Sequence, residues 1–145
     1  MKLVLQRVQS ARVEVAGATV GEIDAGLLVL VGFEPTDTEK TLHQGLQKLL
    51  KIRLFADDQG RMNCDLAAVQ GGLLLVSQFT LAADTRKGHR PGFSTAAAPP
   101  QAAGLFRDFV ALARQHHPIV ATGAFGADMQ VHLINDGPVT FILEF

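Results

Sequence analysis

Two short runs of the sequence are apolar at every position after a leading glycine, and they restrict the possible folds more than any other feature. The runs cover residues 26–31 and 72–76. A run this short and this uniformly apolar is typical of a strand that is buried on both faces. We therefore expect both runs to be strands in the interior of a sheet system.

Two longer segments have the periodicity of amphipathic helices. The first follows Thr36 and Glu39, which have the spacing of a capping box. The second starts at Pro99 or Pro100, residues that suit a first helical turn. The pattern predicts a single domain over residues 1–145, in which two helices flank the sheet. The apolar face of the first helix consists of Leu42, Leu46, Leu49 and Leu50. Further strand-like segments are residues 2–8, 12–15 and 53–55.

Composition limits the possible partners and compartment. The chain has 145 residues, a formal net charge of −1 and one cysteine, Cys64, which has no internal disulfide partner. A reducing cytoplasm fits this cysteine usage best. No apolar run approaches the ~20 residues of a membrane span, so we expect no membrane association. The overall charge does not favour DNA, and any contact with nucleic acid needs a local basic cluster.

Hydrogen-bonding residues follow the second apolar run directly, as Ser77-Gln78-Phe79-Thr80. A buried strand that ends in this way places polar groups at the rim of a sheet, where sites are common. Ser77 lacks the Gly-x-Ser-x-Gly elbow of a hydrolase. Thr80 is a candidate nucleophile, but it would need an activating base and no motif supplies one. Alternatively, Thr80 is a β-branched strand residue with a structural role, and its hydroxyl makes a hydrogen bond to a backbone group.

A Gly137-Pro138 pair interrupts the apolar run that covers residues 129–145. Proline has no N–H for a sheet ladder, and X-Pro is the only common peptide bond that is cis at modest cost. We predict a cis bond that forms a rigid backbone corner, with a strand continuing over residues 139–144. The alternative is an ordinary hairpin turn at residues 136–138.

The segment from residue 82 to residue 99 differs from its surroundings because it contains a cluster of basic residues with glycines and a proline among them. Arg86, Lys87, His89 and Arg90 are candidates for phosphate contacts, since they offer charge-assisted hydrogen bonds and counterion release. The alternative is a solvated loop in which Asp84 balances part of the charge. The histidines have no metal-ligand spacing with a carboxylate or cysteine, so we assign no metal.

Residues 77–81 and 135–140 together resemble the two signature motifs of the D-aminoacyl-tRNA deacylases, editing enzymes that remove D-amino acids from mischarged tRNA. Residues 5–8, 84–91 and 122–131 also resemble the family, in the same order along the chain. The resemblance implies a mixed α+β fold (α/β), a layered β/β/α sheet system with two helices. It also implies an enzyme that hydrolyses the ester of D-aminoacyl-tRNA, and some glycyl-tRNA, without a cofactor.

The same resemblance implies roles for individual residues. Backbone groups at Ser77, Gln78, Phe79 and Thr80 would frame the reacting carbonyl, while the 2′-hydroxyl of the terminal adenosine of tRNA drives the reaction. Gly137 and Pro138 would reach across a homodimer to reject L-amino acids, with Arg7 orienting them. Gly92 departs from the family pattern, in which a serine is usual. The implied substrate pocket contains Phe125 and Met129, and the implied tRNA contacts are Arg86, Lys87 and Arg90.

Two other functions remain open. A non-catalytic RNA-binding module would keep the basic loop without needing the Gly-Pro corner, but the chain has no Trp or Tyr and lacks the aromatic sheet pattern of such modules. An editing module that serves beside a synthetase is the second alternative. We expect action in trans, because no linker follows the last strand-like run.

Overall fold

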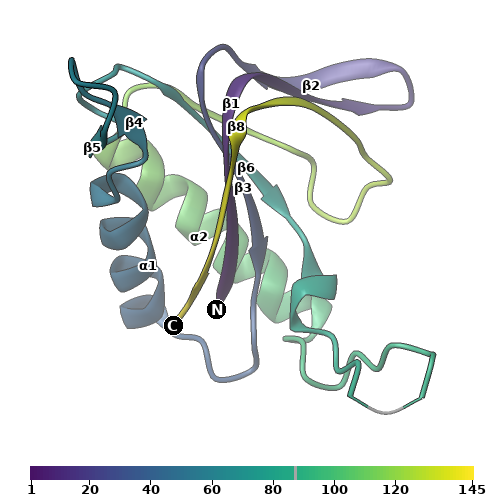
Figure 1. Ribbon diagram of the computed structural model, residues 1–145. Coiled ribbons are helices and arrows are strands. Elements are labelled where there is room, and N and C mark those ends of the chain that lie inside the picture. Colours follow the sequence, from purple (N-terminus) through teal and green to yellow (C-terminus); the bar gives the residue numbers. More distant parts are fainter. Residues whose placement is uncertain (87) are drawn as a thin grey trace.

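The computed structural model describes residues 1–86 and 88–145, which form a mixed α/β fold (Figure 1). Neither of its two α-helices is long and apolar enough to cross a membrane, a finding that covers the described residues. In chain order the elements are β1 (Lys2–Val15), β2 (Ala18–Ile23), β3 (Gly26–Gly32), α1 (Glu39–Lys51), β4 (Phe55–Ala56), β5 (Met62–Cys64), β6 (Gly72–Ser77), the 3₁₀ helix η1 (Phe79–Ala82), α2 (Pro99–His116), β7 (Val120–Thr122) and β8 (Gln130–Glu144).

The main sheet has the strand order β2-β1-β3-β6-β7, and β8 pairs with the other side of β1. The uniformly apolar runs form β3 and β6, which pair in parallel and lie inside this order as expected. The long strand β1 pairs with β3 through its first half and with β2 through its second half. The strand β8 pairs with β1 along almost the whole length of β1, past the point where β1 changes partner from β3 to β2.

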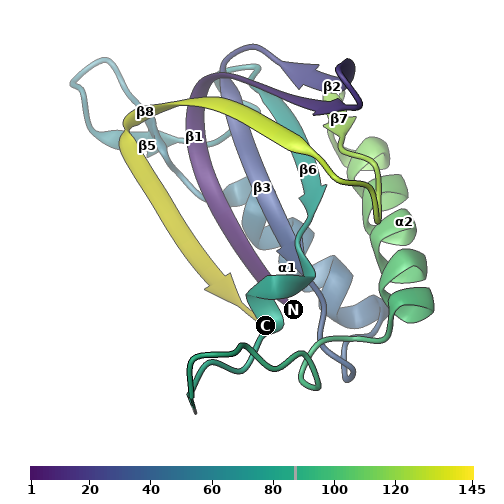
Figure 2. The same cartoon turned by 90° about the vertical axis from the view of Figure 1, so that its right-hand side faces the viewer.

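Alternating residues of the central strands enter two separate hydrophobic cores. Leu27 and Val29 of β3 pack toward the helices, whereas Leu28 between them joins a second core on the opposite face. This alternation is the period-two geometry of a strand. Figures 1 and 2 show both helices on the same side of the sheet. The second core contains Val13 of β1 and Ile23 of β2, so the layers are β, β and α, as the family resemblance implied.

The start of α1 differs from the prediction. The helix begins at Glu39, with Thr38 as its N-cap, and the capping contact joins Thr38 N–H to the Thr41 hydroxyl at 3.2 Å. Thr36 and Glu39 therefore do not form the capping box. Asp37, which lies between Thr36 and the helix, is buried and its side chain is engaged elsewhere. The predicted leucines do face the helix-side core, although Leu50 is only partly buried.

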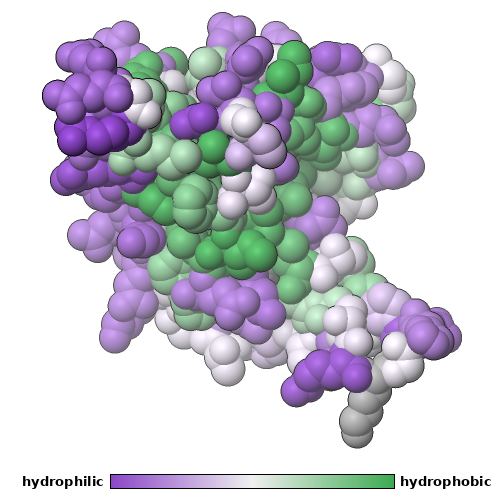
Figure 3. Space-filling model, in the orientation of Figure 1, coloured by the Kyte–Doolittle hydropathy of each residue, from purple (hydrophilic) through white to green (hydrophobic). Residues whose placement is uncertain are grey.

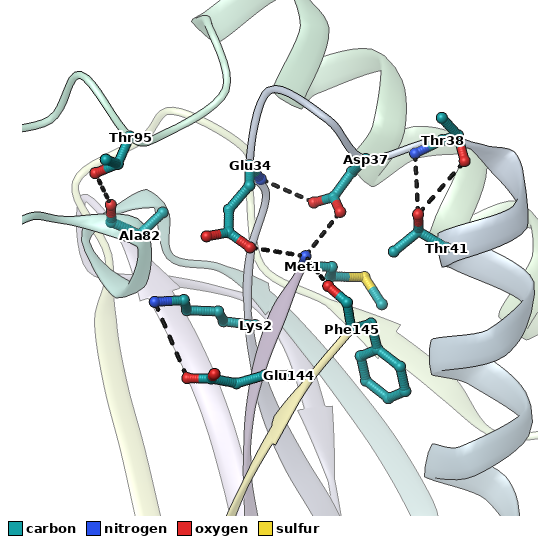
Figure 4. Close-up of polar contacts among 10 residues, drawn as sticks. All are labelled: Met1, Lys2, Glu34, Asp37, Thr38, Thr41, Ala82, Thr95, Glu144 and Phe145. Carbon is teal, nitrogen blue, oxygen red and sulfur yellow. Dashed lines mark hydrogen bonds and ion pairs between the residues drawn. The ribbon is translucent and has the colours of Figure 1, made fainter.

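Asp37 and Glu34 hold the amino group of Met1, which is fully buried (Figure 4). The ammonium nitrogen lies 2.7 Å from Asp37 Oδ1 and 3.1 Å from Glu34 Oε2, and it donates to the Phe145 carbonyl at 3.2 Å. The Met1 ammonium thus joins the C-terminal residue to the loop after β3, which lies at the same end of the sheet as Ser77. These contacts explain why the helix starts later than local spacing suggests.

Two smaller predictions need correction. Residues 2–8 and 12–15 belong to one continuous strand, β1, rather than to separate segments, because β8 pairs with both parts. The strand expected over residues 53–55 covers Phe55 and Ala56 instead, where β4 pairs with β5 and Phe55 lies opposite Cys64. The second helix begins at Pro99, as predicted.

Candidate active site

The candidate active site begins where β6 ends. Ser77 is the last residue of β6 and pairs with Val31 of β3. The next N–H, that of Gln78, donates to the Val31 carbonyl at 2.7 Å. The chain then turns into η1, whose first hydrogen bond joins Leu81 N–H to the Gln78 carbonyl at 3.2 Å. The N–H groups of Phe79 and Thr80 precede that bond, so the helix itself offers them no acceptor.

A cavity of about 550 Å³ opens beside this turn. Its lining includes Ser77, Gln78 and Phe79 on one side and Phe125 and Met129 on another. The structure therefore brings together two sets of residues that the sequence separates by more than forty positions. The lining has more apolar than polar surface, which is typical of a pocket for a small organic group.

Parallel pairing explains why these two segments meet. β7 pairs with β6 in parallel, with Leu75 opposite Thr122, and Gly123 N–H continues the ladder to the Leu75 carbonyl at 3.0 Å. Neighbouring parallel strands end at the same edge of a sheet. The segment after β7 thus emerges next to Ser77. Met129 packs close to Gly123, where an added Cβ would lie only 2.7 Å from the Met129 sulfur.

Thr80 does not have the surroundings of an activated nucleophile. Its hydroxyl accepts a hydrogen bond from Gln78 Nε2 at 2.6 Å, and the residue is exposed. Among the described residues, no carboxylate or imidazole makes a hydrogen bond with the Thr80 side chain. A threonine nucleophile requires an adjacent base. The geometry therefore favours the structural interpretation of this hydroxyl over the nucleophilic one.

Gly137 and Pro138 lie outside this cavity. Their peptide bond is cis, and the strand continues after it, as predicted. Arg7 holds the segment, because its Nε donates to the Asp136 carbonyl at 3.0 Å and lies 3.2 Å from Asp136 Oδ2. Arg7 is opposite Leu27 of β3. That position is about four residues from the Ser77 end of the sheet, roughly 13 Å along the strands.

The predicted basic loop is closed at its base by an antiparallel bridge between Asp84 and Gly92, with N···O distances of 2.8 and 2.9 Å. Arg86 makes a two-pronged ion pair with Asp84, at 2.9 and 2.8 Å. These hydrogen bonds from Arg86 lower the pKa of the Asp84 carboxyl and raise the pKa of the Arg86 guanidinium. Arg90 is exposed. Lys87 lies outside the described residues.

Comparison with known proteins agrees with this geometry. A model of the family described as D-Tyr-tRNA(Tyr) deacylase matches residues 4–144. A protein named D-aminoacyl-tRNA deacylase from Pseudomonas aeruginosa (strain LESB58) is 65% identical over 144 residues, which cover 99% of each chain. The chain belongs to the D-Tyr-tRNA(Tyr) deacylase family. Membership in this family identifies it as a hydrolase.

Two solved structures extend the comparison of this deacylase. One, titled c-Myc DNA Unwinding Element Binding Protein, has a TM-score of 0.96 and 40% identity, and the match covers 100% of this chain and 99% of that one. The other, titled as a structural analysis of a probable eukaryotic D-amino acid tRNA deacylase, has a TM-score of 0.84 over 98% of this chain and 97% of that one. Its 19% identity supports the shared fold alone.

The sequence did not single out every residue that lines the cavity of this deacylase. Phe93, from the return arm of the basic loop, contributes an aromatic ring, and the start of α2 contributes Pro99 and Ala102. Local periodicity could not have indicated them, because they enter through a loop and a helix end. The aromatic Phe93 within a polar, glycine-rich stretch was the one available signal.

The histidines of the deacylase lie away from the cavity. His117 is buried and its Nε2 lies 2.8 Å from the Gly71 carbonyl, beyond the end of α2. His132 on β8 lies 3.4 Å from Glu14 of β1. Across residues 1–86 and 88–145, no group of three or more His, Cys, Asp or Glu side chains is placed to hold a metal ion.

Proposed function

We propose that this deacylase hydrolyses the ester bond of D-aminoacyl-tRNA in the cavity between Ser77 and Met129. Water adds to the ester carbonyl, the bond to the ribose oxygen breaks, and the D-amino acid and free tRNA leave. The observation that carries the proposal is the meeting of the Ser77–Phe79 turn with Phe125 and Met129 around one cavity. A carbonyl held there would lie beside backbone N–H groups that have no acceptor within η1.

The chemistry needs little from the side chains. An amino acid esterified to ribose is an activated ester with a neighbouring hydroxyl, so positioning and stabilisation of the developing oxyanion suffice. In our proposal the N–H groups of Phe79 and Thr80 face the oxyanion, and the 2′-hydroxyl of the tRNA assists the reaction. The surroundings of Thr80 support this assignment, because its hydroxyl is hydrogen-bonded to the side-chain amide of Gln78 and not to a base.

Selection against L-amino acids requires a rigid group where an L side chain would point. We assign that role to Gly137 and Pro138 of a second copy, because the same chain holds this segment away from its own cavity. Arg7 orients it through Asp136. Glycine has no side chain to reject, so some glycyl-tRNA would also be cleaved.

A homodimer would also cover the exposed apolar residues of β8. Ile134, Phe141 and Ile142 are 56%, 41% and 67% exposed, and β8 has a paired neighbour, β1, on one side. Figure 3 shows apolar side chains gathered at the centre of the face that β8 crosses in Figure 1. An apolar surface of this kind is typical of an interface between proteins.

The loop closed by Asp84 and Gly92 is our candidate for contact with the acceptor end of tRNA. The positive charges of Arg86 and Arg90 support this role, although the ion pair between Arg86 and Asp84 neutralises part of the charge of the loop. We do not propose DNA binding, although one relative carries that title. The net charge of −1 does not favour a duplex. We place the enzyme in the cytoplasm, where charged tRNA is found.

The deciding assay follows loss of the ester from D- and L-tyrosyl-tRNA. The purified protein should release D-tyrosine at a rate well above background and leave L-tyrosyl-tRNA intact. A non-catalytic RNA-binding module would bind both substrates and cleave neither. A module that depends on a synthetase would be active only when that synthetase is added. Duplex DNA should not compete with tRNA in the same assay.

A further inference from the structure

The amino group of Met1 is a positive charge that belongs to a fully buried residue. Its nitrogen lies 2.7 Å from Asp37 Oδ1 and 3.1 Å from Glu34 Oε2 (Figure 4). The Phe145 carbonyl accepts a third hydrogen bond from it at 3.2 Å. An ammonium group has three N–H donors, so each donor has an acceptor in this site. A buried charge is tolerated when it is paired and hydrogen-bonded in this way.

Asp37 depends on this ammonium group for its counter-charge. Its side chain is 3% exposed, and within the described part of the chain the Met1 ammonium is the one cation at ion-pair distance from it. The other carboxylate oxygen, Oδ2, accepts Glu34 N–H at 2.8 Å, which fixes the carboxylate in its own loop. If one partner of a buried ion pair loses its charge, the other is left uncompensated, and the fold is strongly destabilised. A neutral group therefore cannot take the place of the Met1 amine.

The side chain of Met1 occupies a space that a glycine leaves open. Gly45 lies inside α1, where glycine is about 1 kcal/mol less favourable than alanine. A Cβ added at Gly45 would overlap the methyl group of Met1. Met1 also belongs to the helix-side core. The fold thus uses both the amine and the methyl group of this residue, and loss of the residue would leave a void and an unpaired carboxylate.

The loop that binds the ammonium group also supports the wall of the cavity. Ala97 N–H donates to the Phe33 carbonyl at 2.9 Å, and Gln101 Nε2 donates to the Pro35 carbonyl at 3.0 Å. Ala97 and Pro99 line the cavity. A change at the Met1 nitrogen that displaces this loop would therefore reach the cavity wall through these two hydrogen bonds.

We propose that the Met1 nitrogen is a modification-sensitive site: the protein keeps this methionine, and the fold is complete only when the nitrogen carries no acyl group. A chain that starts with formylmethionine must first be deformylated by an amide hydrolase. Water adds to the formyl carbon, the C–N bond breaks, formate leaves and the amine keeps the proton. The resulting ammonium group binds Asp37 and Glu34. A formyl group that remained would replace the charge with a neutral amide and add atoms where three acceptors already lie.

The test compares the wild type and Asp37→Asn, each purified with a free and with a formylated Met1. The formylated proteins come from cells treated with an inhibitor of deformylation, and intact mass identifies them because they are heavier by the mass of CO. Formylation should lower the urea midpoint of the wild type by about 1–2 M. In Asp37→Asn the shift should be less than half as large, because no uncompensated carboxylate remains. Equal shifts in both proteins would overturn the role of the charge pair.

Asp58→Asn is the matched control, because it makes the same substitution at an exposed turn position. Formylation should lower its urea midpoint as much as it lowers that of the wild type. Amide hydrogen exchange at Ala97 should be faster in the formylated wild type than in the free form, since the loop that holds its acceptor is displaced. Purified protein that lacks Met1, or that is formylated and equally resistant to urea, would overturn the proposal.

A pair of glycine variants tests the seat of Met1 without any formylated protein. Gly45→Ala and Gly104→Ala both replace a glycine inside a helix, and a Cβ added at Gly104 meets no atom within 4 Å. Gly104→Ala should raise the urea midpoint, because alanine is the better helix former. Gly45→Ala should give no such rise, because the Met1 methyl group has to move. Equal rises in the two variants would overturn the inference that the fold requires Met1 in this place.

Discussion

At the scale of single residues, our proposal assigns the chemistry of the candidate site to backbone groups more than to reactive side chains. Gln78 Nε2 donates to the Thr80 hydroxyl, so these two polar side chains of the motif are hydrogen-bonded to each other. The sequence identified these residues correctly as neighbours at a sheet rim, but only the structure shows how their side chains pair. In our proposal the site acts through fixed backbone N–H groups. A substitution that changes only a side chain leaves those groups in place.

The first prediction separates tRNA-assisted catalysis from a threonine nucleophile. Thr80→Ala should keep cleavage of D-tyrosyl-tRNA within about tenfold of the wild-type rate, whereas loss of a true nucleophile typically costs roughly 10⁴-fold or more. A substrate that ends in 2′-deoxyadenosine should be cleaved poorly by both proteins. Single-turnover kinetics measures both effects. Abolished turnover in folded Thr80→Ala, with normal turnover of the deoxy substrate, would assign the chemistry to the protein.

The second prediction concerns the buried contact of Asp37. Its side chain is 3% exposed and lies 2.7 Å from the Met1 ammonium. Asp37→Asn removes the charge that faces this cation, so the free energy of unfolding should fall by about 1.5–3 kcal/mol, the usual range for a hydrogen bond to a charged group. Urea denaturation measures the change. Asp58→Asn, at an exposed turn position, serves as the control and should have little effect.

At the scale of elements, the two segments of greatest interest are each closed by specific hydrogen bonds, between backbone groups in the basic loop and through a side chain in the β8 corner. The basic loop is closed by the Asp84–Gly92 bridge. The corner in β8 is closed by Asn135, whose Oδ1 accepts Val139 N–H at 2.6 Å. Both segments were recognised in the sequence by their glycine and proline content. Their closing contacts depend on pairs of residues that local pattern does not specify.

The third prediction tests the loop as a contact for tRNA. Replacing both Arg86 and Arg90 with alanine should weaken tRNA binding. It should also reduce the slope of log K against log salt by about 1.5, because binding without these two phosphate contacts releases fewer counterions. Fluorescence anisotropy over a salt series measures the slope. Lys48 and Lys51, exposed in the last turn of α1, provide a control pair of the same charge. An unchanged slope would leave the loop as an ordinary solvated segment.

At the scale of the whole molecule, the cavity and the Gly137–Pro138 corner lie at different places on one chain. A second copy is the simplest way to bring them together. The exposed apolar residues of β8 are the surface that such a copy would cover. In our proposal, chiral selection is therefore a property of the assembly rather than of one chain.

The fourth prediction is therefore a homodimer with twice the chain mass in sedimentation. Ile142→Asp should shift the protein to monomer, since it places a charge on a 67% exposed apolar position of β8. The monomer should discriminate less between D- and L-tyrosyl-tRNA. Val20→Asp, at an exposed position of β2, should remain dimeric. A wild-type monomer with full D selectivity would contradict the placement of Gly137 and Pro138 in a neighbouring site.

The sequence by itself determined the elements whose signal is local. The uniformly apolar runs became β3 and β6, and the helical periodicities became α1 and α2. Ser77–Thr80 and the Gly137–Pro138 corner were recognised in the same way. Each of these features depends on residues within a few positions of one another, which periodicity and backbone preference describe well.

Only the tertiary structure decided which of these segments meet. Parallel pairing of β6 with β7 placed Phe125 and Met129 beside Ser77, and the packing of the basic loop added Phe93 to the same cavity. The buried ammonium of Met1 engaged Asp37, so that α1 begins after Thr38 rather than after Thr36. These outcomes depend on contacts between residues that are far apart in the chain. A short segment of sequence does not specify the free energy of such contacts.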